Sequence, residues 1–212
     1  MSGRPEQLFP LFAGIETLDG VGPKTAQHLE QMHVTRPRDL IFTLPHSGVD
    51  RRKRETIKGA DLPGVVTVEV VIGQHRYPRS RGAAYRVVVE DSETSFQLVF
   101  FHARGEYLQK LLPTGQRRIV SGKIEIFDSI AQMVHPDHVL PLDAADHLPP
   151  FEPHYPLTAG LNLKGVLKAM AGALERLPVV PEWIERSIID EKSWPDWRSA
   201  VQRAHAPDQA QD

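Results

Sequence analysis

The fold of this chain is decided by Val65-Val66-Thr67-Val68-Glu69-Val70-Val71-Ile72, a run rich in β-branched residues and bounded by Gly64 and Gly73. Branched side chains pack well on a pleated surface, so the run predicts a β-strand. Similar runs follow it along the chain, interrupted by one segment with helical spacing. We expect further strands at 85–91, 95–101, 118–126 and 131–135, and a helix at 104–112.

The order of these elements predicts the class of fold. Three strands, a short helix and two more strands are the order of an OB-fold, a five-stranded barrel that binds oligonucleotides. Gly122 lies in the centre of the fourth strand and fits this order, because a strand shared across a closing barrel has to bend. The sequence therefore predicts a β barrel with flanking helices (α+β); an unrelated small barrel or sandwich is the alternative.

Composition limits the classes of protein that remain. The 212 residues are 41% hydrophobic, enough for one large or two small domains, and they include no cysteine, which excludes disulfide scaffolds and thiolate sites. No apolar run approaches the length of a membrane span, and the first residues have no signal-peptide core. We therefore expect a soluble, cytoplasmic protein, associated with the nucleoid if it binds DNA.

The basic residues are concentrated in one part of the chain. The net charge is −2, yet residues 51–89 hold nine Lys and Arg against three Asp and Glu. Such a segment is typical of a polyanion site, with a solvated basic face as the alternative. Its densest part is the loop between the first two strands, which flanks the binding face in OB-folds. We predict nucleic-acid contacts from the loop's Arg76, Tyr77, Arg79 and Arg81.

The end of the third strand carries two adjacent aromatic residues, Phe100 and Phe101. Strand side chains alternate between faces, so one ring must point away from the core unless a flanking element covers it. An exposed aromatic side chain at a strand end is a candidate platform for stacking a base. Burial of both rings between the barrel and its neighbours is the alternative.

A turn near the N-terminus predicts a second contact with phosphate. Leu18-Asp19-Gly20-Val21-Gly22-Pro23-Lys24-Thr25-Ala26 reads as a turn with two glycines that allow positive φ, followed by a helix that opens on Pro23. The amides of Gly22, Lys24 and Thr25 would be unpaired beside the Lys24 ammonium, which favours a phosphate. The spacing resembles the helix-hairpin-helix motif, which holds DNA backbones. An ordinary capping turn is the alternative.

The residues after the barrel read as a linker and helices. Five prolines in Pro141–Pro156 predict the linker, and 157–177 predicts a helix with an apolar stripe and a possible cap at Asn162. Two short helices are expected to start at 181–184 and 193–197. We expect Trp183, Trp194 and Trp197 to bury against the barrel or against a domain that this chain lacks.

The succession of motifs resembles the N-terminal part of RecG-type DNA helicases, from about Phe9 to Pro207. The motifs are the Leu18–Leu29 turn and helix, Asp39–Pro45, Asp50-Arg51-Arg52, the barrel with Val120–Lys123, Met133–Pro136, Tyr155–Leu161 and Ala204–Pro207. The resemblance implies a wedge that splits DNA strands at a branch point, with basic loops on the backbones and two aromatic residues on unpaired bases.

At the positions of those aromatic residues this chain has Phe101 and Tyr107, although Ala103-Arg104-Gly105 lengthens the step between them. We count Arg51 and Arg52 among the DNA-binding residues, together with Gly20, Gly22, Lys24 and Thr25 of the turn. The resemblance implies three segments: a helical part with a basic linker at 1–60, the wedge at 61–142, and a linker with short helices at 143–212. The implied partners are branched DNA and the helicase domains; we expect a monomer.

No ATP-binding loop of the G-x-x-x-x-G-K-[ST] type occurs in the chain, so we expect no ATPase activity and no catalytic residue, with ATP and Mg²⁺ confined to absent motor domains. His135-Pro136-Asp137-His138 puts two imidazoles and a carboxylate close together, but Pro136 prevents a helix from aligning the two histidines, so no metal site is expected. The functional alternative is an independent OB-type module that binds single strands or another protein.

Overall fold

The computed structural model describes residues 5–80 and 82–206. These residues form two compact units. The barrel unit is continuous in sequence, from Val49 to Glu152. The terminal unit combines the described residues up to Gly48 with those from Pro153 onward. The division into three segments at residues 60 and 142 stays a prediction. In the structure, most of the first segment and most of the third belong to the same compact unit.

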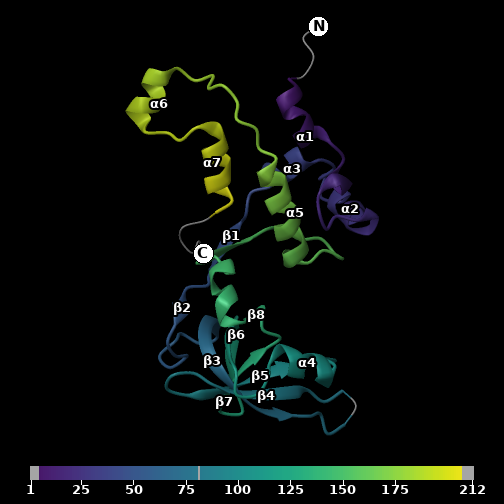
Figure 1. Cartoon of the computed structure of the whole chain (residues 1–212), viewed down its shortest axis with the longest axis vertical. Coiled ribbons are helices and arrows are strands. Elements are labelled where there is room, and N and C mark those ends of the chain that lie inside the picture. Colours follow the sequence, from purple (N-terminus) through teal and green to yellow (C-terminus); the bar gives the residue numbers. More distant parts are fainter. Residues whose placement is uncertain (1–4, 81, 207–212) are drawn as a thin grey trace. The chain divides into compact units, whose positions relative to one another are not determined.

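The barrel unit is built on a seven-stranded sheet in the order β2-β3-β4-β5-β7-β6-β8 (Figure 1). An antiparallel pairing of β3 with β6 closes five of these strands into a ring, as the OB-fold prediction requires. The fold class predicted from the sequence is therefore confirmed. The elements are β2 (Lys53–Arg54), β3 (Gly64–Arg76), β4 (Tyr85–Glu90), β5 (Ser95–Phe100), α4 (Gly105–Leu111), β6 (Arg117–Phe127), β7 (Ile130–Val134), β8 (His138–Leu140) and the 3-10 helix η3 (Leu142–His147).

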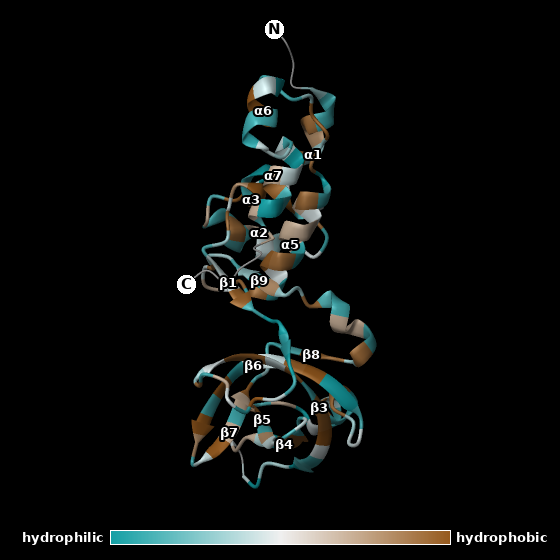
Figure 2. Cartoon of the chain, turned by 90° about the vertical axis from the view of Figure 1, so that its left-hand side faces the viewer, coloured by the Kyte–Doolittle hydropathy of each residue, from teal (hydrophilic) through white to brown (hydrophobic). Residues whose placement is uncertain are grey.

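Alternation along the strands forms the core of the barrel. Hydrophobic side chains line the inner face of β3 and its neighbours, and brown hydrophobic stretches run along β3 and β6 in Figure 2. The helix α4 covers one end of this core with Leu108, while Leu112 follows it, both almost fully buried. Gly122 lies where β6 passes closest to its neighbours: a Cβ there would be 3.0 Å from Met133 Sδ and 3.2 Å from Pro136 Cα. This close approach gives the glycine its structural reason.

The terminal unit has a core made from two distant parts of the sequence. Leu11, Leu29 and Leu40 from the first part pack with Val166 and Met170 from the last. Asn162 caps α5 as expected, since its side chain accepts a hydrogen bond of 2.8 Å from the Gly165 amide. The helical elements are η1 (Glu6–Leu8), α1 (Phe9–Phe12), η2 (Ile15–Thr17), α2 (Pro23–Glu30), α3 (Pro37–Ile41), α5 (Leu163–Glu175), α6 (Arg186–Lys192) and α7 (Trp197–Ala204).

Two expectations for the C-terminal third differ from the structure. The helix begins at Leu163 rather than Leu157. The proline-rich linker contains η3 and the strand β9 (Phe151–His154), which pairs with β1 (Ser47–Asp50) in a two-stranded sheet. Trp183 and Trp194 are 67% and 52% exposed, while Trp197 packs against the terminal core. None of the helices in the described ranges is long and apolar enough to cross a bilayer.

Candidate nucleic-acid interface

One end of the barrel gathers the predicted loop and the exposed aromatic residue. In the ladder of β4 and β5, Tyr85 lies opposite Phe100, and in the ladder of β3 and β4, Arg76 lies opposite Arg86. The loop after Arg76 and the residue after Phe100 therefore leave the sheet at the same end. The arginine loop and Phe101 therefore lie at the same end of the barrel, as the sequence predicts.

The outer face at this end carries two arginines side by side. Arg76 and Arg86 are cross-strand partners, and Val99 is the next partner of Arg86 in β5. Side chains of such partners lie about 5 Å apart at Cβ, and like charges in this position destabilise a sheet. Arg86 was not among the predicted residues. Its position beside Arg76 depends on strand register, which no local motif encodes.

We call the concave surface around these side chains the basic hollow. Its volume is about 620 Å³, and it is lined by Gln74, His75, Arg76, Tyr77, Arg79, Ala83, Ala84 and Arg86. The lining includes three arginines and no acidic residue. Among the described residues, none of these arginines has an ion pair or a side-chain hydrogen bond. Arg81, also predicted for this loop, lies outside the described residues.

Polar and aromatic side chains hold the base of the loop. His75 donates from Nε2 to the Leu112 carbonyl at 2.8 Å, and its Nδ1 shares a hydrogen bond with the Tyr85 hydroxyl, also at 2.8 Å. Burial, with the neighbouring Tyr77 phenol, raises the pKa of Tyr85 to about 12. The Tyr77 ring meets Tyr85 edge to face at 5.1 Å, and its hydroxyl accepts a hydrogen bond from Gln109 of α4. The predicted stacking residue Tyr77 is thus anchored to the barrel while 58% exposed.

Gly105 at the start of α4 makes room for this arrangement. A Cβ at that position would lie 3.3 Å from Tyr77 Cε1 and 3.4 Å from Tyr85 Cε2. A larger residue would have to displace one of the two rings. From the sequence, Gly105 was recognised only as part of the lengthened segment between Phe101 and Tyr107, and its packing role was not predicted.

Phe101 presents its ring to solvent and is held in place by His135. Phe101 is 42% exposed, whereas Phe100 is buried at 8%, so the two rings do take opposite faces. The Phe101 amide donates to His135 Nε2 at 3.2 Å, and the two rings lie 5.9 Å apart between centroids. His135 itself donates its amide to the Val99 carbonyl at 2.8 Å and has a left-handed backbone, with φ of 47°. Sequence reasoning missed this support, because nothing in the sequence marks the left-handed backbone at His135.

Tyr107 lies in the first turn of α4 and is 62% exposed, so its ring is also open to a ligand. Arg104 precedes it and is exposed as well. Phe101, Tyr107 and the basic hollow all belong to the barrel unit. Their contacts with DNA stay predictions.

Arg51 does not fit the predicted DNA-binding role, because its side chain is buried. The guanidinium pairs with Glu152 at 2.7 Å and with Asp137 at 2.8 Å, and it donates to Ser121 Oγ at 3.0 Å. Burial acts to raise the pKa of Glu152, but the hydrogen bond from His138 and the charge of Arg51 outweigh it and hold that pKa below its ordinary value. Arg51 therefore links the first and last residues of the barrel unit through a buried ion pair, and its side chain does not face a ligand.

Arg52 is exposed but already paired. It forms an ion pair of 2.6 Å with Asp50 and lies over the Phe151 ring at 5.1 Å. The cluster around His135 is likewise engaged: Asp137 pairs with Arg51, and His138 donates to Glu152 at 2.9 Å. Within residues 5–80 and 82–206, no group of three or more potential ligands is arranged to hold a metal ion.

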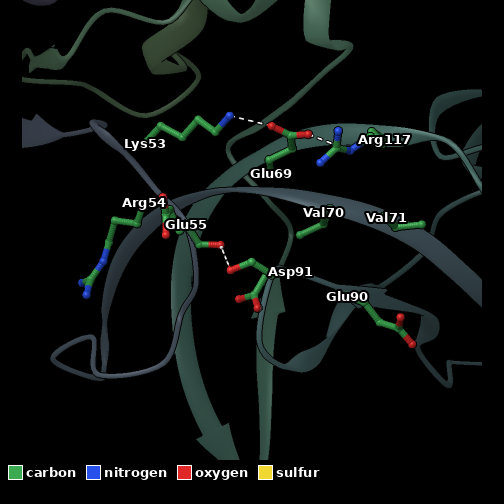
Figure 3. Close-up of a pocket in the computed structure, with 10 residues that line it drawn as sticks. Lys53, Arg54, Glu55, Glu69, Val70, Val71, Glu90, Asp91 and Arg117 are labelled. Atoms are coloured by element: carbon green, nitrogen blue, oxygen red, sulfur yellow. Dashed lines mark hydrogen bonds and ion pairs between the residues drawn. The ribbon is translucent and has the colours of Figure 1, made fainter.

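A second hollow on the barrel has compensated charges (Figure 3). It has a volume of about 370 Å³ and contains four acidic residues beside its basic ones. Glu69 lies between Lys53 at 2.5 Å and Arg117 at 2.7 Å, and Figure 3 shows both side chains directed at its carboxylate. The hydrogen bond from Lys53 is the main cause that lowers the pKa of Glu69. This hollow therefore lacks the uncompensated positive charge of the basic hollow.

The glycine turn belongs to the terminal unit and matches the prediction in part. The helix α2 opens on Pro23 as expected, and Gly20 has φ of 80°, whereas Gly22 is extended with φ of −87°. The element before the turn is η2, a single 3-10 turn, so no full helix precedes it. Lys24 is exposed and Thr25 is half-buried. Asp19 pairs with Lys168 of α5 at 2.8 Å beside Gly20. Phosphate binding at this turn stays a prediction.

Comparisons with known proteins find similarity first to the barrel and then to most of the chain. The family described as "OB-fold nucleic acid binding domain" matches residues 66–140. The ATP-dependent DNA helicase RecG of Acidithiobacillus ferridurans is 26% identical over 92% of this chain and 28% of that protein. RecG of Aquifex aeolicus is 22% identical over 84% of this chain and 24% of that protein. The chain thus spans about a quarter of the length of the curated relatives it matches.

A solved structure of RecG bound to a three-way DNA junction has the same fold. It matches 92% of this chain and 27% of its own chain with a TM-score of 0.78 at 22% sequence identity. The match covers both the barrel and the helices of the terminal unit, since it extends over nearly the whole chain.

Proposed function

Because this chain is homologous to RecG over about 90% of its length, we propose that it binds branched DNA as a strand-separating wedge. The substrates would be replication forks, three-way junctions and Holliday junctions, and the process would be recombination and repair. The chain would recognise the branch point. ATP-driven movement along DNA would belong to helicase domains, since the longer relatives are named as ATP-dependent DNA helicases.

The observation that carries the proposal is the end of the barrel. An exposed aromatic ring, Phe101, follows β5 at the same end of the barrel at which the arginines without acidic partners lie. Aromatic faces stack unpaired bases of any sequence, and arginine forks bind phosphate oxygens. A branch point offers both groups at once, because bases are unstacked there while the backbones stay continuous.

The support of Phe101 favours a rigid wedge. The hydrogen bond to His135 fixes the Phe101 backbone, and the His135 ring contacts the Phe101 ring, so the ring loses little further freedom when a base stacks on it, which improves affinity. At the branch point, one unpaired base would stack on Phe101 and another on Tyr107. This stacking would stabilise the separated strands. The arginines would fix the backbone without reading sequence.

The test compares DNA of equal length and different shape. We expect the purified chain to bind a three-way junction more tightly than a matched duplex or single strand, measured by fluorescence anisotropy at fixed salt. Phe101→Ala should remove about 1–3 kcal/mol of junction binding and leave duplex binding nearly unchanged, because stacking operates only on unpaired bases. Ile126→Ala, which truncates another exposed apolar side chain of the barrel, is the matched control.

Equal affinity for single strands and junctions would contradict the wedge and favour the alternative, an independent single-strand-binding or protein-interaction module. The proposal carries no role for ATP, Mg²⁺ or any other cofactor in this chain, and it assigns catalysis to none of its residues. We further propose that the chain acts as a monomer in the cytoplasm, at the nucleoid, in contact with helicase domains and without a membrane.

A further inference from the structure

We propose that the basic hollow binds one phosphodiester group of a DNA strand, shared between Arg76 and Arg86, next to the nucleotide that stacks on Phe101. The inference rests on the proposed function and deepens it by assigning a single phosphate to a specific pair of side chains. Arg86 is the new residue of this site, and Arg79 lies on its rim.

The first argument is the charge of the pair. Arg76 and Arg86 lie directly opposite each other on β3 and β4, and no acidic residue lines the hollow. Elsewhere on the barrel, adjacent basic residues share a carboxylate, as Lys53 and Arg117 share Glu69. An anion between Arg76 and Arg86 would take the place that Glu69 has there. A phosphate suits it because each guanidinium can donate two hydrogen bonds to its oxygens.

The second argument is the fixed surface around the arginines. The His75 imidazole is held by hydrogen bonds with the Leu112 carbonyl and the Tyr85 hydroxyl, both at 2.8 Å. The loop is anchored by Tyr77 on Tyr85 and Gln109. Among the described residues that line the hollow none is acidic, so none opposes an incoming phosphate, and Arg76 and Arg86 are already paired across their strands.

The third argument is the distance to the stacking ring. Arg86 is paired with Val99 across β4 and β5, and Phe101 follows Val99 by two residues, directly after the end of β5. Ordinary strand spacing and rise put the α-carbons of Arg86 and Phe101 about 8 Å apart. The long arginine side chain therefore reaches the backbone of a nucleotide whose base lies on Phe101.

The test is a double-mutant cycle on salt dependence. Each phosphate contact contributes about 0.9 to the slope of log K against log salt on duplex DNA and about 0.7 on single strands. If Arg76 and Arg86 share one phosphate, then the Arg76→Gln/Arg86→Gln double variant should reduce the junction-binding slope by about 0.9, and neither single variant should reduce it by more than the double variant does. Arg117→Gln, which alters an exposed arginine paired with Glu69, is the control and should leave the slope unchanged.

Two outcomes would overturn the inference. A reduction near 1.8 in the double variant would mean two separate phosphates, and an unchanged slope would remove the pair from the interface. In both cases preferential binding to junctions would persist and the proposed function would stand.

A second measurement does not need DNA. Inorganic pyrophosphate should raise the melting temperature of the unmodified chain and of Arg117→Gln, but not of the Arg76→Gln/Arg86→Gln variant, because a ligand of the folded state stabilises it. An equal shift in all three proteins would contradict the site. If the chain failed to prefer junctions while this specific shift appeared, the hollow would be an anion site and the proposed function would be wrong.

Discussion

Two runs of basic residues in the barrel unit look alike in sequence and differ in the structure. In the first, Arg51, Arg52 and Lys53 are paired with Glu152, Asp50 and Glu69 respectively. In the second, the arginines of the basic hollow have no acidic partner among the described residues. The partners of Arg51 and Lys53 come from residues 101 and 16 positions away in the sequence.

The difference teaches that a count of charges along a sequence does not locate a binding surface. Net positive charge attracts a polyanion only where it is not already neutralised by neighbours in space. The first run stabilises the barrel, and the second remains free for a ligand. Three experiments would break or sharpen this distinction.

The largest effect is expected from Arg51→Met. Removing the guanidinium leaves the buried Glu152 without its main cationic partner, and breaking a buried ion pair typically costs 3–5 kcal/mol of stability. We expect a loss of about 3 kcal/mol in the free energy of unfolding, measured with urea. Arg52→Ala, which alters an exposed pair, should cost less than about 1 kcal/mol. Similar losses in the two variants would contradict the distinction between the buried and the exposed arginine.

The pairing of Glu152 also predicts a dependence on pH. Because its pKa is lowered in the folded state, its contribution to stability is complete above the ordinary value of 4.5 and is lost as the pH falls below it. The unfolding free energy should therefore fall more steeply below pH 4.5 in the unmodified protein than in Glu152→Gln. Parallel curves for the two proteins in urea titrations at several pH values would show that this carboxylate is not stabilised by Arg51 and His138.

The smallest effect is expected from Lys53→Gln, compared with Arg79→Gln. Arg79 is exposed and unpaired among the described residues, so its loss should lower the salt slope of junction binding by up to about 0.9. Lys53 is already neutralised by Glu69, so its loss should change the slope by less than about 0.3. An equal decrease for the two variants would mean that Glu69 releases Lys53 to DNA, and the first run would then join the interface.

Local patterns in the sequence were sufficient for the fold of the barrel. Alternating β-branched runs, the Gly and Pro boundaries and the helix at 104–112 predicted the five ring strands and α4 in the correct order. The cap at Asn162 was also predicted, since it depends on residues three positions apart. These features are encoded within a few residues of where they act.

The candidate site was predicted in part, because it depends on contacts between distant residues. Arg76, Arg79 and Phe101 could be identified from their loop and strand end. Arg86 was missed because its partner is set by strand register, and Arg51 was wrongly placed at the surface because Glu152 is far away in sequence. The contacts of the barrel end and of the glycine turn with DNA remain predictions.

The discontinuous terminal unit has a consequence for biosynthesis. Leu11, Leu29 and Leu40 are made before the barrel, yet their packing partners Val166 and Met170 are made after it. At about 5–20 residues per second, the ribosome needs on the order of ten seconds to add the intervening residues. During that interval the barrel can fold as a local unit while the first leucines await their partners. Slow folding of the barrel would lengthen the time for which a nascent chain is vulnerable to aggregation and to proteases.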